Sequence, residues 1–301
     1  MDAIILSLAR ELGREAVHVE NVVKLIDEGN TIPFIARYCK ELHGTMDDTT
    51  LRTLADRLNY LRNLDKRRGE VKAAIEGQGK LTEELSAAID AAATLAEVED
   101  LYRPYKQKRR TRATVAREKG LEPLAELLFA QAADGPAPEE AAGAFIDPEK
   151  GVETAEDALQ GASDIIAERI SDDADIRKRL RELVWKKGYL VSAAAAKEPE
   201  DTVYRLYYAF RSPLNRVQGH QVLAINRGER EGVLKASVEM DREAALIPVR
   251  RAVLNPGAPA MSFVRAAAED AYDRLIFPSV EREMRSLLTE QADEGAIKMF
   301  G

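Results

Sequence analysis

Apolar residues recur every three or four positions through most of the chain, which is the spacing of one face of an α-helix. In the clearest case, between 51 and 75, leucine, valine and isoleucine form an apolar stripe of about seven helical turns, with Asp47 or Asp48 as its capping residue. Aromatic residues are few, at 6%, and alanine is abundant. The pattern predicts an all-α, multi-helical fold with a long central helix. Residues 233–240 alternate apolar and polar positions, so we expect at most a small β element there.

Near the N-terminus the pattern predicts two short helices joined by a turn. The first helix ends at Gly29, and Thr31 and Pro33 then have the character of the cap and first turn of a second helix over 34–42. This is the outline of a helix-turn-helix-like element. Such a pair can read DNA, or it can pack as any antiparallel helix pair does, and the outline leaves both interpretations open.

The chain length favours two helical units over one. Residues 186–202 lack strong periodicity and contain four consecutive alanines, so we place a joint between subregions there. The predicted domains are therefore a helical domain over 1–195 and a mainly helical connecting region over 196–301. The apolar pattern from 279 onward is still helical where the sequence stops, and we expect further sequence to follow it.

Composition narrows the class of protein. Hydrophobic residues make up 45% of the chain and charged residues 32%, a balance typical of a folded protein. The net charge is −8, so contact with nucleic acid would have to come from a locally basic surface. No stretch approaches the roughly 18 consecutive apolar residues of a membrane-spanning helix, and no signal peptide is visible. Cys39 is the only cysteine, which excludes an intramolecular disulfide and favours a reducing compartment, the cytoplasm.

A basic run from 103 to 117 is the main candidate for chemistry, because no acidic residue occurs there before Glu118. Its positive residues are Arg103, Lys106, Lys108, Arg109, Arg110, Arg112 and Arg117. Such a density of cations can displace counterions from a phosphate backbone, and Tyr102 and Tyr105 could stack on exposed bases. Alternatively, the same arginines can pair with acidic helices of the protein itself. The first six cations are our candidate nucleic-acid-binding residues.

Motifs for catalysis or metal binding are missing from the sequence. His18, His43 and His220 stand far apart and form none of the spacings typical of zinc ligands. Residues 76–80 resemble a phosphate loop but lack the Ser or Thr after the lysine, and no Gly-x-Ser-x-Gly elbow occurs. We predict no enzyme activity, no cofactor and no metal. An enzyme whose acidic residues converge into a metal site in space is the remaining alternative.

Five long and irregular strings, spread over nearly the whole chain, carry a resemblance to a known family. They are residues 31–38, 81–85, 101–111, 120–125 and 227–234. These strings resemble the N-terminal region of the Tex family, bacterial transcription accessory proteins related to a eukaryotic transcription elongation factor. Two features depart from the family: Cys39 stands where arginine is common, and 191–210 is shorter and richer in alanine.

The resemblance implies more than the residues show by themselves. In the family, this helical region includes a helix-turn-helix element and precedes an RNase-H-like domain, a helix-hairpin-helix and a C-terminal OB-fold that binds RNA. The nuclease-like domain is regarded as inactive, so no catalytic residue is carried onto this chain. We therefore expect a non-catalytic scaffold whose partners are nucleic acid, RNA more than DNA, the transcription machinery and its own downstream domains. The alternative is a pure protein-interaction module without nucleic-acid contact.

Overall fold

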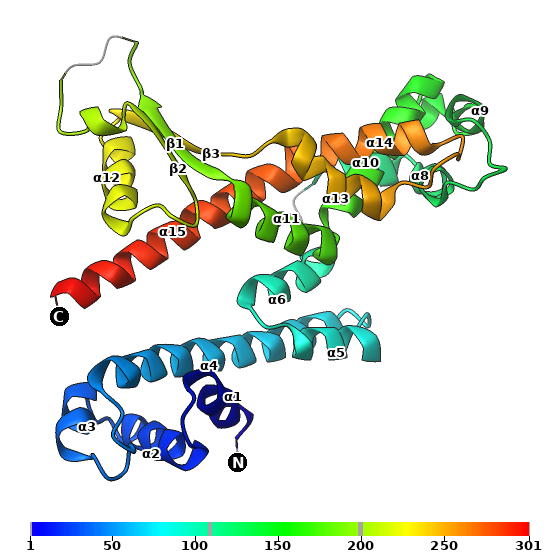
Figure 1. Ribbon diagram of the computed structural model, residues 1–301. Coiled ribbons are helices and arrows are strands. Elements are labelled where there is room, and N and C mark those ends of the chain that lie inside the picture. Colours follow the sequence, from blue (N-terminus) through cyan, green and yellow to red (C-terminus); the bar gives the residue numbers. More distant parts are fainter. Residues whose placement is uncertain (1, 108–109, 198–200, 301) are drawn as a thin grey trace. The chain divides into compact units, whose positions relative to one another are not determined.

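A computed structural model describes residues 2–107, 110–197 and 201–300, with side chains up to Asp293 (Figure 1). The chain forms two compact units, Met1–Tyr105 and Lys106–Gly301. The division predicted between 195 and 196 does not coincide with a break in the structure. It would separate a β-strand that ends at Ala194 from both of its partner strands.

The first unit is helical throughout. Its elements are α1 (Ala3–Leu12), α2 (Ala16–Asp27), α3 (Ile32–Tyr38), α4 (Asp48–Glu76), α5 (Glu83–Ala91), α6 (Leu95–Tyr102) and a 3-10 turn, η1 (Arg103–Tyr105). The predicted long helix is confirmed as α4, and the Asp47 carboxylate caps it by accepting the Thr50 N–H. One end of α4 packs against α1, α2 and α3, and the other end packs against α5 and α6.

The predicted second short helix is shorter than expected. Thr31 caps α3 as predicted, by accepting the Phe34 N–H, but the helix ends at Tyr38 rather than at 42. Beyond Tyr38 the chain forms turns, and the Leu42 carbonyl accepts a hydrogen bond from the Asn21 amide of α2 and lies 3.1 Å from His18 Nδ1. That α2 and α3 read DNA remains one of two hypotheses, beside plain packing of the two helices.

The second unit is built around one central helix, α10, which packs against α7, α8, α9 and α14. The elements of this unit are α7 (Arg112–Glu118), α8 (Glu122–Ala130), α9 (Pro138–Gly143), η2 (Pro148–Lys150), α10 (Ala155–Ser171), α11 (Ala174–Lys187), β1 (Tyr189–Ala194), η3 (Arg205–Tyr207), β2 (Ala209–Pro213), α12 (Gly219–Arg230), β3 (Leu234–Glu239), α13 (Arg242–Val253), α14 (Met261–Asp270), the π-helical segment η4 (Ala271–Ile276) and α15 (Phe277–Phe300). The predicted C-terminal helix is confirmed as α15.

A small antiparallel sheet with strand order β2-β1-β3 lies in this unit, and α12 and α15 pack against β3 (Figure 1). The structure confirms a mostly helical fold with a small β element, and β3 is the predicted strand. The other two strands were missed. The stretch predicted as a joint contains β1, where Leu190 is buried opposite Val238. An alanine-rich stretch shows little periodicity of its own, so partner strands on both sides decide its conformation.

Among the described residues, no helix combines the length and the apolar character that crossing a membrane requires.

Candidate nucleic-acid interface

The basic run spans the end of the first unit and the beginning of the second. Arg103 lies in η1, Arg110 precedes α7, and Arg112 is the first residue of α7. Lys108 and Arg109 lie outside the described residues. Arg103 and Lys106 both have interaction partners within the chain. The candidate residues that the structure describes are therefore distributed over a turn and a helix start.

One carboxylate on α10 holds α7 in place. Thr111 caps α7 by accepting the Thr114 N–H at 3.0 Å, and its own hydroxyl donates to Glu168 at 2.9 Å. At the other end of α7, Arg117 donates to Glu168 at 2.8 Å and to Glu122 at 3.2 Å. Burial lowers the pKa of Arg117. The two hydrogen bonds raise the pKa by more than burial lowers it, so the pKa lies above its ordinary value. Arg117 is thus paired within the protein.

The cations before and at the start of α7 are more accessible. Arg110 donates to Glu118 at 2.7 Å, and both side chains are more than half exposed. An exposed pair of this kind contributes only about 0–1 kcal/mol, so a phosphate group can compete for Arg110. Arg112 is exposed, and its charge acts on Asp164 of α10. Burial raises the pKa of Asp164, and the charges of Arg274 and Arg112 offset part of that rise.

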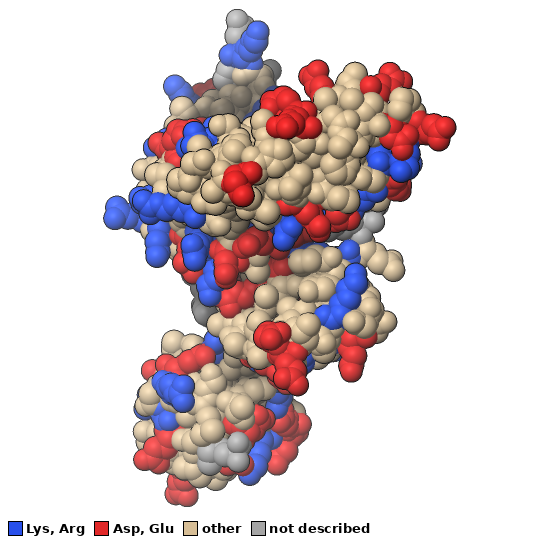
Figure 2. Space-filling view, turned by 90° about the vertical axis from the view of Figure 1, so that its right-hand side faces the viewer, with Lys and Arg blue, Asp and Glu red and all other residues tan. Residues whose placement is uncertain are grey.

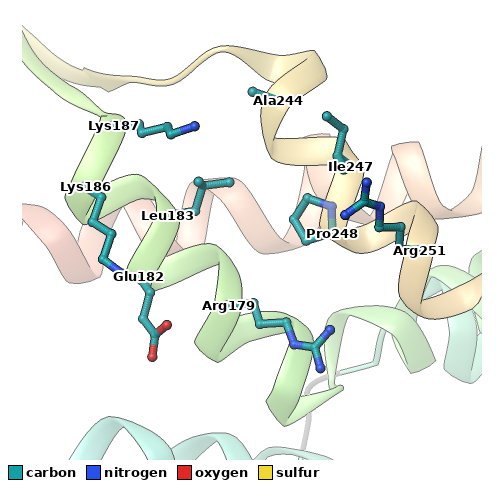
Figure 3. A pocket seen from close by; sticks show the side chains of 9 residues that line it. All are labelled: Arg179, Glu182, Leu183, Lys186, Lys187, Ala244, Ile247, Pro248 and Arg251. Atoms are coloured by element: carbon teal, nitrogen blue, oxygen red, sulfur yellow. The ribbon is translucent and has the colours of Figure 1, made fainter.

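A second positive surface, which the sequence analysis missed, lies in a groove between α11 and α13 (Figure 3). Its volume is about 450 Å³. The residues that line it are Arg179, Glu182, Leu183, Lys186, Lys187, Ala244, Ile247, Pro248 and Arg251. The adjacent Lys186 and Lys187 are a signal of positive charge that the sequence contains. Arg251 is remote from them in sequence, so the cluster exists only in the folded chain.

Charge is distributed unevenly over the surface. On the face shown in Figure 2, groups of Lys and Arg side chains lie beside groups of Asp and Glu side chains. An acidic protein can therefore present local positive surfaces to an anionic partner. Within the described ranges, no three His, Cys, Asp or Glu side chains are grouped so that they could hold a metal ion.

Comparison with known proteins gives two matches to family patterns. Residues 2–76 match the Tex-like protein N-terminal domain, and residues 134–300 match the pattern described as Tex central region-like. Three relatives illustrate the similarity. The uncharacterized protein YdcI of Bacillus subtilis is 44% identical over 97% of this chain and 41% of its own length. The transcriptional accessory protein Tex of Neisseria gonorrhoeae is 37% identical over 97% of this chain and 39% of its own length. The human S1 RNA-binding domain-containing protein 1 is 32% identical over 93% of this chain and 29% of its own length. The chain thus spans about two fifths of these bacterial relatives.

Proposed function

This chain belongs to the Tex family, and from that premise we propose that it is a non-catalytic helical scaffold that takes part in nucleic-acid binding and transcription regulation. The name of the Neisseria relative describes an accessory protein of transcription, and the name of the human relative includes RNA binding. Both names favour a nucleic-acid-related role over a reaction. The proposed location is the cytoplasm, in line with a single cysteine in the chain.

The observation that carries the nucleic-acid contact is the basic start of α7. Glu168 fastens both ends of this short helix to α10, so Arg110 and Arg112 project from a supported element. Cations held in this way can bind phosphate groups with little loss of conformational entropy. We propose that they contact a phosphate backbone together with Lys106, Lys108, Arg109 and Arg103, with RNA preferred to DNA. The transcription machinery and downstream domains of the whole protein are the further proposed partners.

Salt dependence of binding tests this proposal. The probe is a fluorescent 15-nucleotide single-stranded RNA, compared with duplex DNA of the same length, between about 50 and 200 mM salt. The triple variant Lys106→Ala, Arg110→Ala and Arg112→Ala is expected to bind more weakly, with a salt slope reduced by up to about 0.7 for each lost contact to single-stranded phosphate. The matched control carries the same charge change at three exposed cations elsewhere, namely Lys80→Ala, Arg216→Ala and Arg265→Ala.

The control is expected to keep the slope of the unchanged chain. Equal slopes for the two triple variants would overturn the assignment to the basic run. A complete lack of RNA and DNA binding at about 50 mM salt would favour the alternative function, a protein-interaction module in which the basic run is paired internally. The ion pairs of Arg110 and Arg117 are the observation in favour of that alternative.

A further inference from the structure

The groove between α11 and α13 is formed by one face of each helix. On α11, the lining residues Arg179, Leu183 and Lys187 are spaced four residues apart, so they lie on one side of the helix. On α13, Ala244, Ile247, Pro248 and Arg251 follow at offsets of three, four and seven. Figure 3 shows Lys187 and Leu183 extending from α11 toward α13. The groove is therefore a continuous trough bordered by two helical stripes.

Apolar side chains form the middle of this trough. Ile247 is 47% exposed, and Leu183, Ala244 and Pro248 are partly buried. Pro248 lies inside α13 and has no N–H, so it cannot donate the helical hydrogen bond to the Ala244 carbonyl. An apolar strip with a backbone acceptor beside it suits the side chains and polar groups of a peptide.

Within the part of the chain that the structure describes, the cations around the strip have no partner, unlike their neighbours on the same helices. Among described residues, none forms a hydrogen bond or an ion pair with Arg179, Lys186, Lys187 or Arg251. By contrast, Arg181 pairs with Glu283, and Arg250 pairs with Glu243 and Glu269. Glu182 is the single acidic residue in the lining, which leaves a surplus of three positive charges in a chain of net charge −8.

Charge and shape together identify the chemistry of the occupant. We propose that this groove binds an acidic amphipathic helix of a protein partner, with apolar side chains over Ile247 and Leu183 and carboxylates beside Lys187 and Arg251. None of the described lining residues is aromatic, so the groove offers no platform for base stacking. Arg179 and Lys187 are eight residues apart, or about 12 Å along the helix axis, which is about two turns of a partner helix.

The experiment uses two peptides of identical composition and charge. The first is a fluorescent 18-residue peptide with leucine at helical spacing and glutamate flanking the leucine face. The second has the same residues in an order that abolishes the apolar face. Fluorescence anisotropy at about 100 mM salt is expected to show at least about tenfold tighter binding of the amphipathic peptide, because burial of hot-spot apolar side chains contributes most of the affinity.

Variants of the groove then separate charge from apolar contact. Lys187→Glu with Arg251→Glu is expected to weaken binding at least about tenfold and to remove its salt dependence. Ile247→Ser is expected to weaken binding about five- to tenfold while the salt dependence stays unchanged. The control Lys80→Glu with Arg265→Glu carries the same charge change at exposed positions elsewhere and is expected to stay within about twofold of the unchanged chain. Unchanged thermal unfolding midpoints would show that each variant is folded.

Equal binding of the two peptides would overturn the proposal, and so would an equal loss of peptide affinity in the groove variant and the control variant. A third contrary result would be displacement of the peptide by a 15-nucleotide oligouridylate, together with loss of oligouridylate binding in the groove variant. The last result would assign the groove to nucleic acid. Hydrogen exchange provides a second readout, because a bound helix is expected to protect backbone amides within 179–187 and 244–251. These outcomes are distinct from those of the RNA experiment, which changes only the basic run.

Discussion

The basic run and the α11/α13 groove both concentrate positive charge, but they use it differently. In the run, Arg110 pairs with Glu118, and Arg117 pairs with Glu168. In the groove, Lys187 and Arg251 have no ion-pair partner among the described residues. The run is conspicuous in the sequence, whereas the groove is assembled from two distant helices. Charge density along a chain therefore does not indicate which charges are available to a partner.

The same helix shows this contrast at close range. Arg177 on α11 is fully buried and donates to Ser279 and Glu283 of α15, while Arg179 is exposed in the groove. A single residue lies between these two arginines, yet they face opposite sides of the helix. The position of each side chain relative to acidic neighbours therefore decides whether an arginine stabilises the fold or remains open to a ligand.

The largest difference in the free energy of unfolding is expected between a variant that lacks the buried arginine of α11 and a variant that lacks the exposed one. Arg177→Met is expected to lower the free energy of unfolding by about 3–5 kcal/mol, because it breaks a buried ion pair. Arg179→Met should change the free energy of unfolding by no more than about 0.5 kcal/mol, as is usual for an exposed position. Urea unfolding followed by circular dichroism measures both values. Similar losses in the two variants would contradict the distinction between paired and available cations.

A pH series can isolate the acidic partner of this buried pair. Burial raises the pKa of Glu283, but the hydrogen bond from Arg181 and the charges of Arg181 and Arg177 outweigh burial and hold its pKa below 4.5. The ionised form therefore stabilises the folded state fully above pH 4.5, and this stabilisation is lost as the pH falls through the lower pKa of the folded state.

The expected result is a stability difference between the unchanged chain and Glu283→Gln of about 1.5–3 kcal/mol at pH 7. The difference should shrink as the pH falls below 4.5, since the unchanged chain then loses the same charge. Asp164→Asn provides an opposite control, because burial raises the pKa of Asp164 and its ionised form opposes folding. A difference for Glu283→Gln that is constant between pH 3 and 7 would refute this role.

A substitution at Gly161 of α10 is expected to disturb the packing of α10 against α7, at whose start the basic residues lie. A Cβ atom at Gly161 would lie 2.3 Å from Leu121 Cδ1 and 3.2 Å from Ala116 Cβ, which is closer than van der Waals contact. Gly161→Ala is therefore expected to destabilise the chain by about 1–3 kcal/mol through overpacking and to weaken RNA binding by displacing α7. Gly143→Ala is the matched control, because nothing lies within 4 Å of a Cβ atom there. Equal thermal midpoints for the two variants would argue against this close packing.

The smallest effect should come from freeing a paired cation. Glu118→Gln removes the partner of Arg110 but is expected to change the free energy of unfolding by less than about 1 kcal/mol, because the pair is exposed. The same variant should bind single-stranded RNA more tightly at low salt, with a salt slope that increases by up to about 0.7 if Arg110 gains one phosphate contact. Unchanged RNA affinity would show that Arg110 does not contribute, whichever partner it has.

Short-range features of the fold were predictable from the sequence. The caps Asp47 and Thr31 and the apolar stripe between 51 and 75 located their helices, because a helix is closed by hydrogen bonds between residues about four positions apart. The strand at 234–239 was predictable because apolar and polar residues alternate there. By contrast, β1 became a strand only through pairing with β2 and β3, which its alanine-rich sequence does not specify.

The candidate site divides in the same way. The density of cations could be read from the sequence, because the order of residues from 103 to 117 is a local property. Which of these cations are paired depends on the folded chain. Glu168 meets Arg117 across 51 residues of chain, and α11 and α13 bring Lys187 and Arg251 to one groove. Electrostatic contacts act through space, so the acidic neighbours of an arginine, and hence its availability, follow from packing that no local pattern encodes.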